Sequence, residues 1–108
     1  MDSSDAVYDD AIALQQTGDL DGAVAKLQSL LAQDPDYALA HAALSVFFSR
    51  SDRHDEALEH ARRVCELAPS DPFSFIAMSL LCQKAGRIPE AERAMAQARQ
   101  AHMTSREA

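Results

Sequence analysis

Residues 38–71 read ALAHAALSVFFSRSDRHDEALEHARRVCELAPSD and form the middle one of three 34-residue units that follow one another without a gap. The flanking units are residues 4–37 and 72–105. Each unit carries an alanine at the same place: Ala23, Ala57 and Ala91. A fixed period of this length is typical of a helical solenoid, in which every unit is one helix pair that stacks on its neighbours.

Further columns of the repeat indicate where the helices cross and end. A small residue recurs on the first helix: Ala11, Ser45 and Ser79. A residue that tolerates left-handed backbone recurs after it: Gly18, Asp52 and Gly86. Small side chains let two helices approach closely, and glycine, or less readily aspartate, lets the chain reverse. Pro35 and Pro69 stop the second helices, and Asp71 is placed to cap a helix that opens at Pro72.

These residues, in this order, resemble the tetratricopeptide repeat. Its pattern runs from a large apolar residue through a small residue, an aromatic, Gly and Ala to a closing Pro. The matching residues are Val7, Ala11, Leu14, Gly18, Ala23 and Pro35 in the first unit, His41, Ser45, Phe48, Asp52, Ala57 and Pro69 in the second, and Phe75, Ser79, Cys82, Gly86 and Ala91 in the third. The departures are His41 in a usually aromatic column, Asp10 in a usually apolar one, and Met103 where the closing Pro is expected.

The resemblance implies an all-α fold, a right-handed α-solenoid of three antiparallel helix pairs that forms one domain over residues 1–108. We expect six helices, at about residues 4–17, 19–33, 38–50, 54–67, 72–85 and 88–103, and no strand. At the last repeat, Glu92 and Arg99 replace residues that are apolar in the preceding repeats. Terminal repeats need a polar outer face, so we expect three repeats to be the complete array.

Composition restricts the class of partner. The net charge is −7, and residues 1–37 hold eight Asp against one Lys, whereas residues 72–108 carry a net +2. Nucleic acid is an unfavourable partner for a mostly acidic surface. The acidic start of the chain does not resemble a secretory signal, and no apolar run is long enough to span a membrane. We therefore expect a cytoplasmic protein.

The sequence offers no sign of catalysis or of a bound cofactor. Cys65 and Cys82 are expected to be buried free thiols, with a disulfide or redox pair as the alternative. The histidines fall on different helices or turns, and each is expected to be solvated or partly packed: His41, His54, His60 and His102. The acidic residues of the first repeat lack the pattern of a calcium loop. No nucleophile lies beside a base and no Gly-rich phosphate loop occurs, so we expect neither an enzyme nor a metal site.

The first helices of such arrays line a concave groove, and four positions of each unit are expected to face it. These positions are Asp5, Tyr8, Asp9 and Ile12 in repeat one, Leu39, Ala42, Ala43 and Val46 in repeat two, and Phe73, Ile76, Ala77 and Leu80 in repeat three. The surface is mostly apolar, with acidic residues at one end. Family members that bind the carboxy-terminal carboxylate of chaperones use Lys, Arg and Asn at positions that here hold Tyr8, Ile12, Ala43, Phe73 and Ala77. We expect no carboxylate clamp.

An exposed apolar groove usually marks an interaction site. The leading interpretation is a non-catalytic protein-binding module, an adaptor, scaffold or chaperone-like protein that holds an apolar helix or an extended peptide, basic at one end. A second interpretation is a homo-oligomer that associates through the groove, or through acidic repeat one against basic repeat three. In a third, Leu39, Val46, Ile76 and Leu80 pack on one another and leave little surface exposed.

Overall fold

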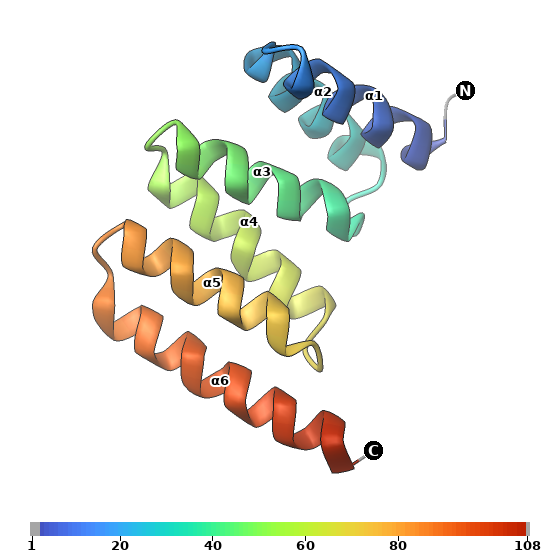
Figure 1. Ribbon diagram of the computed structural model, residues 1–108. Coiled ribbons are helices and arrows are strands. Elements are labelled where there is room, and N and C mark those ends of the chain that lie inside the picture. The colour runs from blue at the N-terminus through green and yellow to red at the C-terminus, as the bar shows by residue number, and fades with distance from the viewer. Residues whose placement is uncertain (1–2, 108) are drawn as a thin grey trace.

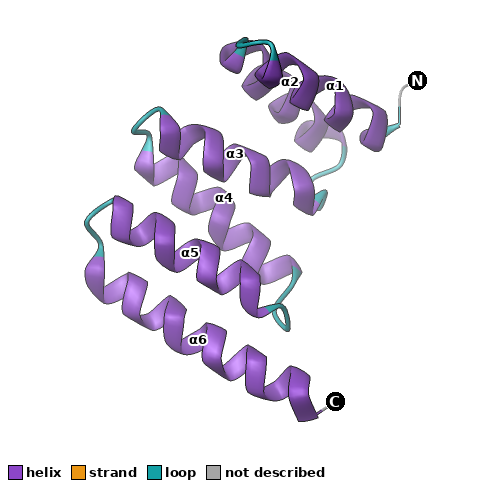
Figure 2. Ribbon diagram, in the orientation of Figure 1, coloured by secondary structure: helices purple, strands orange, loops and turns teal. Residues whose placement is uncertain are grey.

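The computed structural model describes residues 3–107, with side chains up to Thr104. This part of the chain contains six helices and no strand, which confirms the predicted all-α solenoid (Figures 1 and 2). The helices are α1 (Ser4–Gln16), α2 (Leu20–Gln33), α3 (Ala38–Arg50), α4 (His54–Leu67), α5 (Pro72–Lys84) and α6 (Ile88–Glu107). The predicted boundaries agree within one residue, except that α6 continues to Glu107 instead of ending near residue 103.

The helix ends have the local causes that the repeat pattern indicates. Asp71 caps α5, because its carboxylate accepts a hydrogen bond from the Phe73 backbone N–H at 3.0 Å. The residues two positions after α1, α3 and α5 all have left-handed backbone: Gly18 at φ +94°, Asp52 at +60° and Gly86 at +78°. This conformation reverses the chain tightly enough for the next helix to pack back on the previous one.

Within each repeat the two helices cross where both carry small side chains. Ala23, Ala57 and Ala91 are each at most 2% exposed. In repeat three the Ser79 hydroxyl, which is fully buried, donates a hydrogen bond to the Ala91 carbonyl at 2.8 Å. That bond joins the two small-residue columns directly. A larger side chain in either column would push α5 and α6 apart, which explains why these two columns of the repeat hold alanine and serine.

Neighbouring repeats pack through two hydrophobic clusters. One cluster joins repeat one to the first helix of repeat two and includes Leu27, Leu44 and Phe48. The other joins α4 to repeat three and includes Leu58, Met78 and Cys82. Figure 1 shows the resulting arrangement: the helix pairs follow one another from the N-terminus to the C-terminus like steps, with α3 and α5 on the same side.

One expectation about the histidines is wrong. His41 is buried, and its ring contacts the ring of His60 although the two lie on different helices. The Nε2 atom of His41 is 2.7 Å from the Pro35 carbonyl, which can only accept, so the His41 Nδ1 is left to accept from the His60 Nδ1–H at 2.9 Å. His60 also stacks on Phe48 with ring centroids 5.7 Å apart. The histidine in the aromatic column is therefore a fully bonded core residue.

Candidate functional site

A hollow of about 260 Å³ opens between α3 and α5, with α4 as its floor. Its lining is almost wholly apolar and consists of Ala42, Ser45, Val46, Ala61, Val64, Ser74, Ala77, Leu80 and Leu81. The Ser45 hydroxyl is turned to its own helix, where it donates to the Ala42 carbonyl at 2.7 Å. The hollow thus presents hydrocarbon and offers little hydrogen bonding to whatever enters it.

Large hydrophobic side chains are exposed on the two helices that flank this hollow, and two of them, Val46 and Leu80, line it. Leu39 is 55% exposed, Val46 42%, Phe73 75% and Leu80 57%. Among the described residues only two other large hydrophobic side chains are as open, Ile88 and Met103, and both lie on α6. The apolar surface is therefore concentrated on α3 and α5. The interpretation in which Leu39, Val46, Ile76 and Leu80 pack on one another is wrong for all but Ile76, because the other three side chains are exposed to solvent.

The other predicted groove residues divide into two groups. Ala42 and Ala77 line the hollow, whereas Ile76 is half-buried and packs on the core of repeat three. Tyr8, Ile12 and Ala43 pack against the core of repeats one and two. The hollow in the structure is therefore a feature of repeats two and three.

Repeat one places carboxylates near the start of α3. The Tyr37 hydroxyl, at the position preceding α3, donates a hydrogen bond to the Asp5 carboxylate, and the Tyr37 ring contacts the Tyr8 ring at 5.9 Å. This hydrogen bond, together with partial burial and the negative charges of Asp5 and Asp9, raises the pKa of Tyr37 to about 12. Asp5 and Asp9 are exposed, so this end of the surface is acidic and accessible.

Residues of the floor were absent from the predicted set. Ala61 and Val64 reach the hollow from α4, and Ser45 and Leu81 reach it from the helices on either side. The spacing of three between Ala61 and Val64 is compatible with one face of a helix. It does not distinguish a face buried in the core from one seen through the gap between two first helices.

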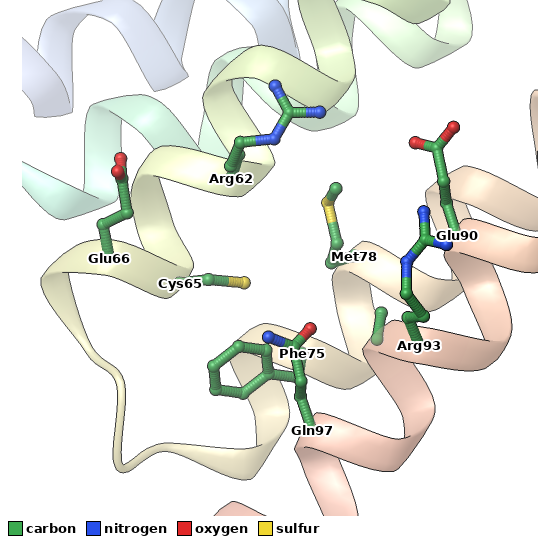
Figure 3. A pocket seen from close by; sticks show the side chains of 9 residues that line it. Arg62, Cys65, Glu66, Phe75, Met78, Glu90, Arg93 and Gln97 are labelled. Atoms are coloured by element: carbon green, nitrogen blue, oxygen red, sulfur yellow. The ribbon is translucent and has the colours of Figure 1, made fainter.

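A second hollow, of about 410 Å³, has a different chemistry (Figure 3). The side chains of Cys65 and Met78 extend into it, with Arg62, Glu90 and Arg93 around it. Both signs of charge line this hollow, so it does not select a charged ligand. The Cys65 thiol donates to the Ser74 carbonyl at 3.4 Å, and burial raises its pKa, which makes it a poor nucleophile.

Among the side chains of residues 3–104, no group of three or more His, Cys, Asp or Glu residues is placed to hold a metal ion. Among the six helices described, none has the length and apolar character needed to cross a membrane. Cys65 and Cys82 are free thiols rather than a disulfide.

Comparisons with known proteins identify the repeat and its structural neighbours. A family model described as tetratricopeptide repeat matches residues 8–72. No curated protein sequence matches the chain. A crystal structure of MamA superimposes with a TM-score of 0.87 at 21% identity, covering 98% of this chain and 62% of that one.

Two further structures show how such folds occur in complexes. A chain of the CopN–Scc3 complex superimposes with a TM-score of 0.83 at 17% identity. The match covers 91% of the chain described here and 58% of the chain in that complex. The second tetratricopeptide domain of Spaghetti (RPAP3), bound to the HSP90 peptide SRMEEVD, has a TM-score of 0.78 at 16% identity and 91% coverage of both chains. At these identities the likeness is one of fold. The chain spans less than two thirds of the MamA and CopN–Scc3 chains that it matches.

Proposed function

The chain belongs to the tetratricopeptide repeat family, and we propose that it is a non-catalytic protein-interaction module that binds a partner segment in the hollow between α3 and α5. The segment would be an amphipathic helix or an extended peptide with apolar anchors and a basic end. The observation that carries the proposal is an apolar hollow lined by the exposed side chains of Val46 and Leu80, with Leu39 and Phe73 also exposed on the same two helices. Contiguous exposed apolar surface of this kind marks interaction sites in soluble proteins.

The size of the hollow favours a side-chain anchor over a small-molecule ligand. Its volume of about 260 Å³ lies below the roughly 300–1,000 Å³ typical of small-molecule pockets. The lining also has few polar groups free to orient a ligand, because Ser45 is bonded to its own helix. An apolar side chain that projects from a peptide needs no such groups, since its backbone is oriented by contacts outside the hollow.

The charge of repeat one supports a basic end on the partner. Asp5 and Asp9 are exposed beside the start of α3, and Leu39 lies in the first turn of that helix. A lysine or arginine of a bound segment would meet these carboxylates while its apolar residues cover Leu39 and Val46. The same charges repel phosphate, so we propose no nucleic-acid partner.

The strength of the interaction can be bounded. Burying one leucine- or phenylalanine-sized side chain contributes about 1.5–3 kcal/mol, so four anchors contribute roughly 6–12 kcal/mol. Association costs about 4–15 kcal/mol in lost motion and ordering. The most favourable balance is about 8 kcal/mol, which corresponds to a Kd of about one micromolar, so we expect a reversible complex of micromolar or weaker affinity. Two free thiols, Cys65 and Cys82, fit a reducing compartment such as the cytoplasm, where we propose that the protein acts.

The proposal is tested with a fluorescent peptide of about 15 residues that carries leucines at helical spacing and two lysines at one end. Leu80→Asp should abolish saturable binding measured by fluorescence anisotropy. Met103→Asp is the matched control, because Met103 and Leu80 are both 57% exposed but only Leu80 lines the hollow. Replacing the lysines with glutamates should weaken binding. Equal binding by the two variants, with helicity retained in both, would exclude the groove as the site.

A further inference from the structure

The positions that join one repeat to the next inside the solenoid also occur at its two ends, where no repeat of this chain covers them. In the second junction, Leu58, Ala61 and Cys65 of α4 pack in one cluster with Met78 of α5. The equivalent residues of the first junction are Val24, Leu27 and Leu31 on α2 and Ala40, Leu44 and Phe47 on α3. Each junction therefore joins three positions of a second helix, the outgoing positions, to three positions of the following first helix, the incoming positions.

At the ends of the array the same positions face solvent. The outgoing positions of repeat three are Glu92, Met95 and Arg99, and the incoming positions of repeat one are Ala6, Asp10 and Ala13. Met95 is half-buried, and the other five residues are exposed. The outgoing positions line a hollow of about 420 Å³, whose rim includes Ile88 at 50% exposure. This C-terminal hollow is where a following first helix would lie.

Placing α1 of a second copy in the C-terminal hollow brings opposite charges together. Cys65 and Met78 extend into the same space in the second junction (Figure 3). One repeat further along, the position of Cys65 is Arg99, and the position of Met78 is occupied by Asp10 of the second copy. An apolar contact inside the chain thus becomes an arginine–aspartate contact between chains. Glu92, the acidic residue of the C-terminal hollow, lies seven residues from Arg99, which is two helical turns away.

We propose that the C-terminal hollow binds α1 of a second copy of this chain, end to end, with Arg99 facing Asp10. Solubility alone requires polar ends, but it does not require an arginine at the one position that would face an aspartate of the next copy. Among the side chains described, Arg99 has no ion pair, and Asp10 is 58% exposed with only a 3.6 Å contact to Lys26. The wider charge distribution agrees, since residues 1–37 carry −7 and residues 72–108 carry +2.

Such a contact is heterologous, so it leaves one free end on each copy and builds short open chains instead of a closed dimer. Its apolar part is small, because Ala6 and Ala13 offer only methyl groups to Ile88 and Met95. Association should therefore appear only at high protein concentration. It should weaken as the ionic strength rises, because exposed charge pairs are screened by salt.

Sedimentation velocity of the whole chain from micromolar to millimolar concentration tests the proposal. The wild type should show mass that increases with concentration at low salt. Arg99→Asp and Asp10→Arg should each weaken association by about tenfold, because each places like charges opposite one another. An equimolar mixture of the two variants should recover it, since the carboxylate introduced at position 99 of one chain then meets the guanidinium introduced at position 10 of the other.

Two control variants separate this surface from others. Arg93→Asp makes the same charge change on α6 but lies in the hollow shown in Figure 3, and it should leave association unchanged. Leu80→Asp, which tests the proposed function, should also leave it unchanged. A chain that stays monomeric throughout, or one whose association is lost in Leu80→Asp and kept in Arg99→Asp, would overturn the end-to-end contact. Neither result would affect peptide binding measured on dilute monomer.

Discussion

Two leucines on adjacent first helices should differ sharply in what they contribute to folding. Leu44 is fully buried between repeats one and two, and Leu80 is 57% exposed beside the hollow. Leu44→Ala should lower the free energy of unfolding by about 2–5 kcal/mol, through lost burial and a new cavity. Leu80→Ala should lower it by about 1 kcal/mol or less, because full burial of leucine is worth about 1.5–3 kcal/mol and Leu80 keeps less than half of that.

Urea denaturation followed by far-ultraviolet circular dichroism measures both values. For a chain of this size each kcal/mol shifts Tm by about 4–8 °C, so Leu44→Ala should lower Tm by roughly 10–30 °C and Leu80→Ala by a few degrees. The slope of the unfolding free energy against urea concentration should be equal in the two variants, because both expose the same surface when the array unfolds. If Leu80→Ala lowers the free energy of unfolding as much as Leu44→Ala does, then Leu80 is a core residue and its side chain is not available to bind a partner.

Three further results are expected. Burial, with the neighbouring His41, lowers the pKa of His60, so the unfolded chain binds more protons between that value and the ordinary one of about 6.5. The free energy of unfolding should therefore fall as the pH drops from 7 through this range. His60→Gln should flatten the dependence of the urea midpoint on pH, and equal slopes for the variant and the wild type would contradict this. Gly86→Ala should cost about 1–2 kcal/mol through its φ of +78° alone, because an added Cβ meets no atom within 4 Å; an unchanged Tm would refute the strain. Burial raises the pKa values of Cys65 and Cys82, so a thiol-reactive disulfide should label the native chain about 100-fold more slowly than the urea-unfolded chain, and similar rates would show that the thiols are open.

The fold was predictable because each column of the repeat has a single local cause. An alanine at a helix crossing, a glycine at a positive φ and an aspartate cap such as Asp71 each act within one turn or one helix pair. Their meaning can therefore be derived from the sequence without knowing the tertiary structure. Three units in register then specify how the pairs stack.

The contacts that were missed depend on relationships between elements. His41 and His60 meet because α3 and α4 cross at that level, and the bond to the Pro35 carbonyl selects the orientation of the His41 ring. Ala61 and Val64 enter the hollow because α4 forms the floor of the space between α3 and α5. Neither the ring orientation nor that space has a signature in the spacing of residues along the chain.

At the predicted groove positions, large apolar side chains are exposed mainly in repeats two and three, whereas Tyr8 and Ile12 of repeat one are half-buried. Leu39, Val46, Phe73 and Leu80 are exposed where the repeat pattern places them. The pattern assumes that corresponding positions have corresponding surroundings, and in repeat one the contact between Tyr8 and the Tyr37 ring changes those surroundings. That contact involves Tyr37, which lies outside the four positions assigned to the groove. That partner segments bind in this groove stays a prediction.

Mapping the peptide on the protein by nuclear magnetic resonance tests the central claim most directly. The isotope-labelled chain is titrated with the leucine- and lysine-containing peptide, at a concentration where the protein is monomeric. Saturable shifts should be concentrated in residues 39–46 of α3 and residues 73–80 of α5, with smaller shifts near Asp5 and Asp9. Shifts centred instead on Arg62 and Arg93, or on the outer face of α6, would contradict a binding site between α3 and α5.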